Sequence, residues 1–120
     1  MERLRWVNKN GKNILIIDFS NLSDPEETKS PARETTELYM QKPEKSILSV
    51  THVEGMRFNN EIAEEMKKLA KDTEPKSKKA VISGMSGLQK TIFKGIQKFS
   101  ERKFDTYNSL EEALEALAKE

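Results

Sequence analysis

One segment constrains the fold of this chain most: a strand, a glycine turn and a helix that follow one another directly. Residues 79–99 read KAVISGMSGLQKTIFKGIQKF, with a short apolar strand over residues 80–82 and a Gly/Ser turn over residues 83–87. Apolar residues then recur at helical spacing, at Leu88, Ile92, Phe93, Ile96 and Phe99. Ser86 and Gln89 form an S-x-x-Q capping box, which places the helix start at the turn. This is half of a β-α-β unit, so it predicts a parallel sheet with packed helices.

The remaining elements are predicted from apolar patterning and from helix and turn residues. Further strands are expected at residues 4–8, 14–19, 46–53 and 104–107, and Asn10-Gly11 predicts a type I′ hairpin between the first two. Asp24-Pro25 resembles a helix start, but Pro31 predicts an interruption, with the helix proper running over residues 30–41. Another helix is expected over residues 60–71, and a last one after the Ser109/Glu112 capping box. The predicted fold is α/β: one domain over residues 1–120, with a mostly parallel sheet of about five strands, an N-terminal antiparallel hairpin strand and four helices.

Composition excludes several classes of function. Lys and Arg number 21 and Asp and Glu 20, a balance that argues against a dedicated nucleic-acid binder. The chain has no cysteine and one histidine, so disulfides, thiolate catalysis and multi-histidine metal sites are excluded within one chain. No signal peptide or membrane-spanning run is found, and a cytoplasmic protein without a cofactor or metal is expected.

Four segments together carry a family resemblance: WVNKNGKNILIIDFSNL, PEKSILSVTHVEGMRFN, KAVISGMSGLQKTIF and FDTYNSLEEALEAL. In their order and spacing they resemble the SpoIIAA-like branch of the STAS superfamily, which is also similar to the CRAL-TRIO lipid-binding fold. The resemblance covers nearly the whole chain. It implies a sheet of about five strands, and a module for interaction or ligand sensing rather than an enzyme.

The resemblance also bears on regulation by phosphorylation. In the anti-sigma-factor antagonists of this superfamily, the loop after the third strand carries an Asp-Ser-Ser-Gly-type motif, and a partner kinase phosphorylates one serine. The matching loop here, residues 52–59, reads HVEGMRFN and has no Ser or Thr. Thr51, the nearest hydroxyl, lies inside the predicted strand. We therefore expect no phosphoserine switch.

Polar residues gather where the central strands are predicted to end. Ligands of open α/β sheets bind outside the carboxyl ends of the strands. The candidate binding residues are Asp18, Ser20, Thr51, His52, Glu54, Met56, Phe58, Ser83, Met85 and Ser86.

Each group of candidates has a structural alternative. The short polar residues could simply cap helices and turns. The apolar ones could be ordinary packing, with Phe58 stapling the following helix. The turn at residues 83–87 could hold an anion or be a close strand-to-helix joint, and it lacks the lysine of a P-loop. Asp18, His52 and Glu54 could serve a metal or acid/base chemistry, but their pattern is weak.

Three hypotheses of function follow from these observations. The first is a non-enzymatic module that binds a protein partner or a small apolar or amphipathic ligand at these loops. The second is a lipid-binding carrier of CRAL-TRIO-like character, for which a dimer could form a pocket of the ~300 Å³ that ligands need. The third is an enzyme that uses Asp18, His52 and Glu54.

Overall fold

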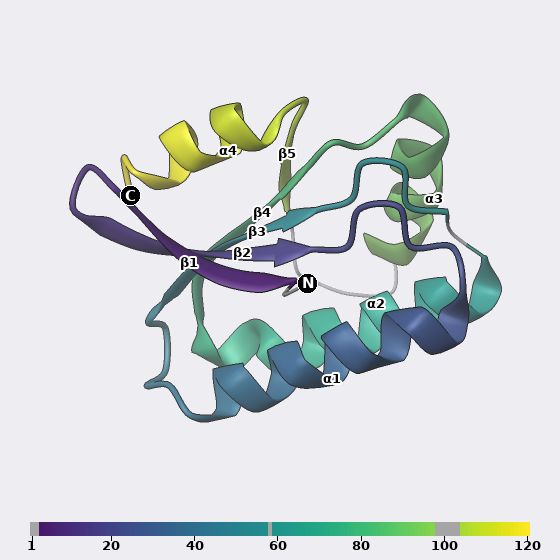
Figure 1. Cartoon of the computed structure of the whole chain (residues 1–120), viewed down its shortest axis with the longest axis horizontal. Coiled ribbons are helices and arrows are strands. Elements are labelled where there is room, and N and C mark those ends of the chain that lie inside the picture. Colours follow the sequence, from purple (N-terminus) through teal and green to yellow (C-terminus); the bar gives the residue numbers. More distant parts are fainter. Residues whose placement is uncertain (1–2, 58, 98–103) are drawn as a thin grey trace.

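Five strands form one sheet in the same order as they follow along the chain (Figure 1). The computed structural model describes residues 3–57, 59–97 and 104–120. The elements are β1 (Leu4–Lys9), β2 (Lys12–Asp18), α1 (Pro25–Met40), β3 (Ile47–His52), α2 (Asn60–Thr73), a 3₁₀ turn (Glu74–Lys76), β4 (Ser77–Ser83), α3 (Gly87–Gln97), β5 (Asp105–Tyr107) and α4 (Leu110–Leu117). β1 and β2 are antiparallel, and all other strand pairs are parallel. The predicted fold class is confirmed.

The strand order determines which face of the sheet each helix covers. Each parallel strand lies beside its predecessor, so right-handed crossovers place successive helices on the same face. Figure 1 shows α1 and α2 below the sheet, and α4 above it. Within the described residues, no helix is both long and apolar enough to cross a membrane.

Two apolar clusters fill the space on either side of the sheet. Alternate residues of each strand point to opposite faces. Leu15, Ile17 and Ile82 therefore pack towards α1 and α2, whereas Ile16, Val50 and Val81 pack under α4. β2 is apolar on both faces because both are covered, as its sequence predicted.

A tight hairpin joins β1 to β2. Asn10 and Gly11 have φ values of 52° and 84°, and a type I′ turn needs positive φ at both central residues. The Asn8 side-chain amide donates to Asn13 Oδ1 at 3.1 Å, and Asn8 Oδ1 accepts from the Gly11 N–H at 3.2 Å. The hairpin prediction is confirmed.

The predicted interruption at Pro31 is wrong. α1 runs unbroken from Pro25 to Met40 with Pro31 inside it. Asp24 caps its start by accepting from the Glu26 N–H at 3.0 Å, and Pro25 occupies the first turn. Because proline has no N–H, the Glu27 carbonyl receives no hydrogen bond from residue 31. The Pro31 side chain is buried, and burial of apolar surface offsets part of this cost.

β4 is also longer than the predicted strand of residues 80–82. It starts at Ser77, because the lysine-rich segment before Ala80 pairs with β3 through its backbone. Lys79 meets Asp105 of β5 at 3.1 Å. Of the apolar residues predicted on α3, Phe99 lies outside the described residues, and only the position of the backbone is described for Ile92, Phe93 and Ile96.

The loops after β2, β3 and β4 pack closely against one another. Backbone N–H groups of Phe19 and Val53 donate to the carbonyls of His52 and Ser83, at 2.8 and 2.9 Å, and so continue the sheet beyond the strands. Gly84 has a φ of +81°, and a Cβ at this position would lie 2.9 Å from His52 Cε1 and 3.0 Å from the Glu54 backbone nitrogen. Only glycine allows this approach, so the joint between β4 and α3 holds the β3 loop in place.

We therefore expect Gly84→Ala to destabilise the protein by about 1–3 kcal/mol, from backbone strain and the clash with the β3 loop. Gly87→Ala is the matched control, because a Cβ there meets nothing within 4 Å and the residue begins α3. Urea denaturation of both variants measures the difference. Equal stability of the two variants would show that the joint is not tight.

Candidate functional site

Three polar side chains lie side by side at the carboxyl ends of the central strands. Asp18 pairs with His52 across β2 and β3, and His52 pairs with Ser83 across β3 and β4. Residues in register share a face, and this face is the one that α4 covers further along the strands. We call Asp18, His52 and Ser83 the polar row.

Hydrogen bonds hold His52 at the centre of the polar row. Its Nδ1 lies 2.8 Å from Ser83 Oγ, and its Nε2 lies 3.4 Å from Glu54 Oε2. With the proton on Nε2, His52 accepts from the Ser83 hydroxyl and faces the Glu54 carboxylate with an N–H. Ser83 has no exposed surface, so its hydroxyl is closed to a substrate. The arrangement therefore favours a structural contact over a serine nucleophile.

Asp18 is almost buried, with 8% of its surface exposed, and it is held by cationic and N–H groups. Its Oδ1 accepts from the Ser20 N–H at 2.9 Å, and its Oδ2 lies 3.9 Å from an Arg5 guanidinium nitrogen. Burial raises the pKa of Asp18, but hydrogen bonds from the Ser20 hydroxyl and N–H, together with electrostatic attraction to His52 and Arg3, lower it by more. The pKa of Asp18 is therefore below its ordinary value, and the polar row carries a carboxylate.

Thr51 lies on the other face of the sheet. It pairs with Ile17 and Ile82, which belong to the cluster beneath α1 and α2. Because neighbouring residues of a strand point to opposite faces, Thr51 and His52 cannot line the same site. The predicted convergence therefore holds for Asp18, His52 and Ser83 and not for Thr51.

The apolar candidates in the loops are mostly buried. Met56 is 3% exposed and Met85 8%, and both belong to the cluster beneath α1 and α2. These two residues pack in the core, which is the structural alternative, and neither offers contact area to a partner. Phe58 lies outside the described residues.

The hypothesis of a metal site gains no support. Within residues 3–57, 59–97 and 104–120, no group of three His, Asp or Glu side chains is arranged to hold a metal ion. Glu54 contacts His52, but 76% of its side chain is exposed, and Asp18 is engaged by Ser20. Asp18, His52 and Glu54 therefore form no shared metal site: Glu54 contacts His52, and Asp18 is bound by Ser20.

A buried glutamine connects the start of α3 to the loop after β3. Gln89 Oε1 accepts from the Ser86 N–H at 2.6 Å, and the Gln89 N–H donates to Ser86 Oγ at 3.2 Å, which confirms the capping box. Its side-chain amide also donates to the carbonyls of Val53 and Met56, at 2.9 and 2.5 Å. Both amide hydrogens and the oxygen are thus used, and only the link between Ser86 and Gln89 is readable from the sequence.

Several residues of the three loops and of the first turn of α3 are exposed above this packing. The Asn21 N–H donates to the Glu54 carbonyl, and the Arg57 N–H donates to the Leu22 carbonyl, both at 2.9 Å. Leu88, in the first turn of α3, is 74% exposed, although its helical spacing predicted the apolar face of the helix. We call this the loop surface; its exposed members are Asn21, Glu54, Arg57, Ser86 and Leu88.

We expect Gln89→Glu to destabilise the protein by about 3 kcal/mol, because a carboxylate would face the Val53 and Met56 carbonyls without a donor. Glu112→Gln is the matched control. Glu112 holds the same place in the second capping box but is exposed, so this change should alter stability by about 0.5 kcal/mol or less. Unfolding in urea compares them, and two equal values would contradict the bridging role of Gln89.

We also expect Asp18 to make stability depend on pH. Its pKa is lower in the folded protein than in the unfolded chain, so its contribution is present at neutral pH and is lost as pH falls through the folded pKa. Asp18→Asn should therefore lower the free energy of unfolding at pH 7, with a smaller difference at acidic pH. Ser20→Ala removes one hydrogen bond to the carboxylate and should lose part of the same difference. Thermal unfolding between acidic and neutral pH is the measurement, and a gap independent of pH would contradict the assignment.

Comparison with known proteins identifies the fold. No protein-family model and no curated protein matches the chain. Among solved structures, the chain is similar to an anti-sigma-factor antagonist (STAS) domain protein from Planctomyces limnophilus. The TM-score is 0.60 and the sequence identity 16%, over 96% of this chain and 97% of the other. The chain therefore has the fold of a STAS domain, as its resemblance to that superfamily predicted.

Proposed function

We propose that this protein is a non-enzymatic, cytoplasmic STAS-like module that binds a protein partner at the loop surface. The observation that carries the proposal is Leu88, a large apolar side chain that is 74% exposed in the first turn of α3. Its neighbour Gln89 joins this turn to the loop that carries the exposed, charged residues Glu54 and Arg57. An apolar contact surrounded by charged groups is typical of a protein interface. The similar solved protein is described as an anti-sigma-factor antagonist, which agrees with a role in binding proteins.

The packing beneath the loop surface organises the loops before a partner binds. Met56 and Met85, two of the apolar candidates for contact with a ligand or a partner, are packed in the core and are available to neither. The loops are joined by backbone hydrogen bonds and by Gln89, so the surface is organised before binding. Binding to such a surface loses little conformational entropy.

The polar row has a supporting role in this proposal. Ser83 is buried against His52, which argues against its use as a nucleophile. Asp18 and His52 lie in register at the ends of β2 and β3, where the Phe19 N–H donates to the His52 carbonyl and joins the loops that follow. Glu54 extends from this row into the loop surface and is available to a partner.

Phosphorylation of the β3 loop is not part of the proposed mechanism. The loop has no Ser or Thr between His52 and Asn59, and Thr51 faces α1 and α2. Ser86 is exposed, but its hydroxyl caps α3 by accepting from Gln89. Control of partner binding would then come from the partner or from its concentration.

Among the residues that the structure describes, no observation favours the alternative function, a lipid carrier. Two clefts border α1, of about 630 and 190 Å³, and both include charged side chains. Neither supplies the enclosed apolar cavity that a lipid needs.

We expect Leu88→Asp to abolish capture of a protein partner by the immobilised protein from a lysate of the cells that make it. Met40→Asp is the matched control: Met40 is 72% exposed, against 74% for Leu88, and it lies at the far end of α1. Quantitative mass spectrometry of the captured proteins gives the readout. If the same proteins are captured by wild type and Leu88→Asp, or lost only with Met40→Asp, the loop surface is not the binding site.

A further inference from the structure

The outer edge of β1 has backbone groups that pair with no other strand described in the structure. β1 is the first strand in the sheet order, and only β2 lies beside it. The Asp18 N–H donates to the Arg3 carbonyl, so Arg3 and Asp18 form a hydrogen-bonded pair. Such pairs alternate in antiparallel strands, and the next ones are therefore Arg5 with Ile16 and Val7 with Ile14. It follows that the N–H and C=O groups of Leu4, Trp6 and Asn8 point away from β2.

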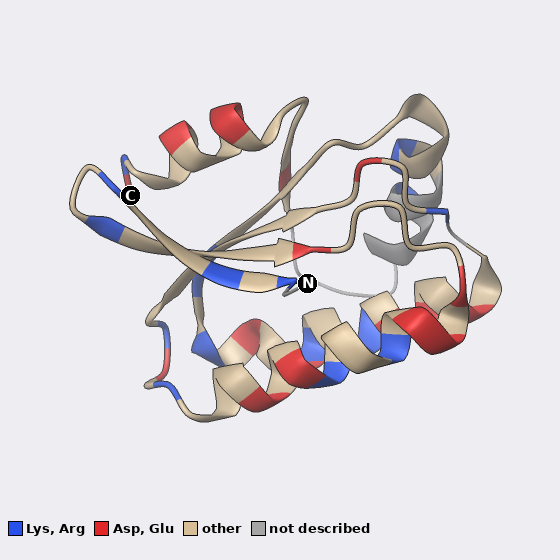
Figure 2. Ribbon diagram, in the orientation of Figure 1, with Lys and Arg blue, Asp and Glu red and all other residues tan. Residues whose placement is uncertain are grey.

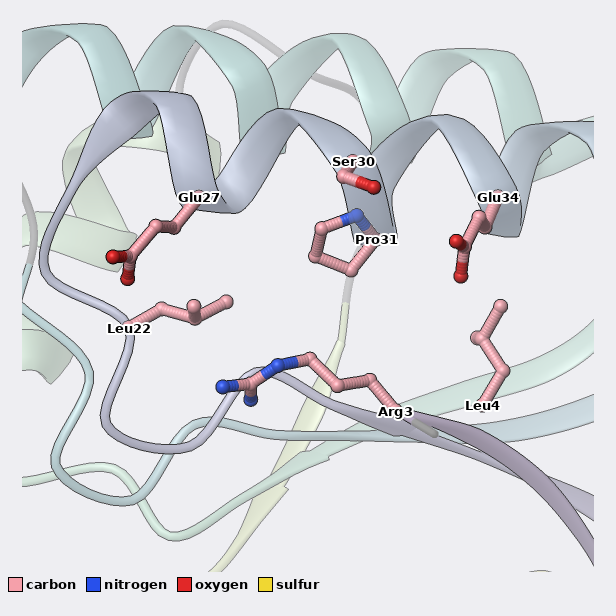
Figure 3. Close-up of a pocket in the computed structure, with 7 residues that line it drawn as sticks. All are labelled: Arg3, Leu4, Leu22, Glu27, Ser30, Pro31 and Glu34. Atoms are coloured by element: carbon pink, nitrogen blue, oxygen red, sulfur yellow. The ribbon is translucent and has the colours of Figure 1, made fainter. Parts of the chain in front are cut away.

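A groove runs beside this free edge, between β1 and α1. Its volume is about 630 Å³, and it is lined by Arg3, Leu4, Leu22, Glu27, Ser30, Pro31 and Glu34. Figure 3 shows Leu4, Leu22 and Pro31 with the carboxylates of Glu27 and Glu34 on the helix side. A chain added to β1 would place its residues opposite Leu4 and Trp6 on this same face. The groove therefore lies where alternate side chains of an added strand would point.

The α1 wall of the groove is acidic. Glu27 and Glu34 are exposed, and among the residues the structure describes neither forms an ion pair. They are seven residues apart, or about 10.5 Å along the helix axis. Three alternate residues of a strand span about 13 Å, so long basic side chains at those positions can reach both carboxylates. Arg3 also lines the groove and keeps its positive charge, but its guanidinium is held by the carbonyls of Asp18 and Ser20, at 3.1 and 3.0 Å. Two carboxylates against one guanidinium leave the groove with a net negative charge.

Trp6 lies in the middle of the free edge, between Leu4 and Asn8. It is the only tryptophan of the chain and is 43% exposed. The Lys42 ammonium lies over the Trp6 ring, 5.3 Å from its centroid. The surface next to Trp6 is therefore basic, in contrast to the acidic wall formed by Glu27 and Glu34. Tryptophan is enriched in protein interfaces, where it often contributes much of the binding energy.

We propose that the β1 edge binds an extended segment of another protein that carries alternating basic side chains, as a sixth strand of the sheet. The added strand pairs with the free groups of Leu4, Trp6 and Asn8, and its basic residues meet Glu27 and Glu34. The main-chain bonds supply affinity, and the acidic wall selects the sequence. This surface is separate from the loop surface, so the inference goes beyond the proposed function.

A second copy of this chain fits the edge less well. Antiparallel pairing of two β1 strands about a two-fold axis places both α1 helices on the same face of the joined sheet, next to each other. The acidic wall of Glu27 and Glu34 would then face its own copy, and like charges repel (Figure 2 shows the acidic residues of α1 in red). Charge complementarity therefore favours a basic segment.

The probe is a synthetic peptide in which lysine alternates with valine, so that every second side chain is basic. Binding is detected through the fluorescence of Trp6. The full-length protein is titrated with this peptide while tryptophan emission is followed. A blue shift that saturates is expected, since an added strand covers Trp6 on its exposed edge. Two control peptides, one with glutamate in place of lysine and one with every backbone amide N-methylated, should cause no shift.

Paired variants test the acidic wall. Glu27→Gln with Glu34→Gln should weaken peptide binding about tenfold at low salt, by loss of two exposed charge pairs. Glu115→Gln with Glu120→Gln removes the same charge from exposed positions on and after α4, and should leave binding unchanged.

Several results would overturn the proposal. The first is that tryptophan emission does not shift with the lysine peptide up to about 1 mM. The second is that either control peptide binds as tightly as the lysine peptide. The third is that the two double variants bind the lysine peptide with equal affinity. Sedimentation of the protein alone provides a further check. A dimer that dissociates in Trp6→Lys would assign the edge to a second copy instead.

Discussion

The side-chain amide of Gln89 joins parts of the chain that are more than thirty residues apart, and the loop surface depends on it. It accepts from Ser86 at the start of α3 and donates to the carbonyls of Val53 and Met56 after β3. A capping box accepts Glu or Gln at this position, but only glutamine also has two N–H groups for those carbonyls. Gly84 allows the loops to approach, and Gln89 holds them together. The platform that carries Leu88, Glu54 and Arg57 is therefore set by one buried amide and one glycine.

The fold could be predicted from the sequence because its determinants are local. Asn10-Gly11 specifies the hairpin, apolar runs specify the buried strands, and capping residues specify the helix starts at Ser86 and Ser109. Pro31 predicts a helix break from local preference alone, whereas buried residues of α1 on both sides of it keep the helix continuous. The error shows tertiary packing overriding a local preference of about 3 kcal/mol.

The candidate site could be predicted only in part. Parallel strands end at the same edge of the sheet, and this predicts that Asp18, His52 and Ser83 lie together. Thr51 does not join them, because it precedes His52 in the strand and therefore points to the opposite face. Burial of Met56 and Met85 and exposure of Leu88 depend on how α3 and the loops dock, which no spacing encodes. Gln89 donates to backbone carbonyls, which every residue has, so the sequence does not identify Val53 and Met56 as its partners.

The loop surface and the β1 edge meet at Arg3. Its guanidinium holds the carbonyls of Asp18 and Ser20, at the start of the loop that carries Asn21, and the same side chain lines the groove beside β1. A substitution of Arg3 would therefore disturb both surfaces and could not separate them. Glu27 and Glu34 touch only the groove, and Leu88 belongs only to the loop surface. The separation of these residues in space is what makes the two proposed binding functions independent and individually testable.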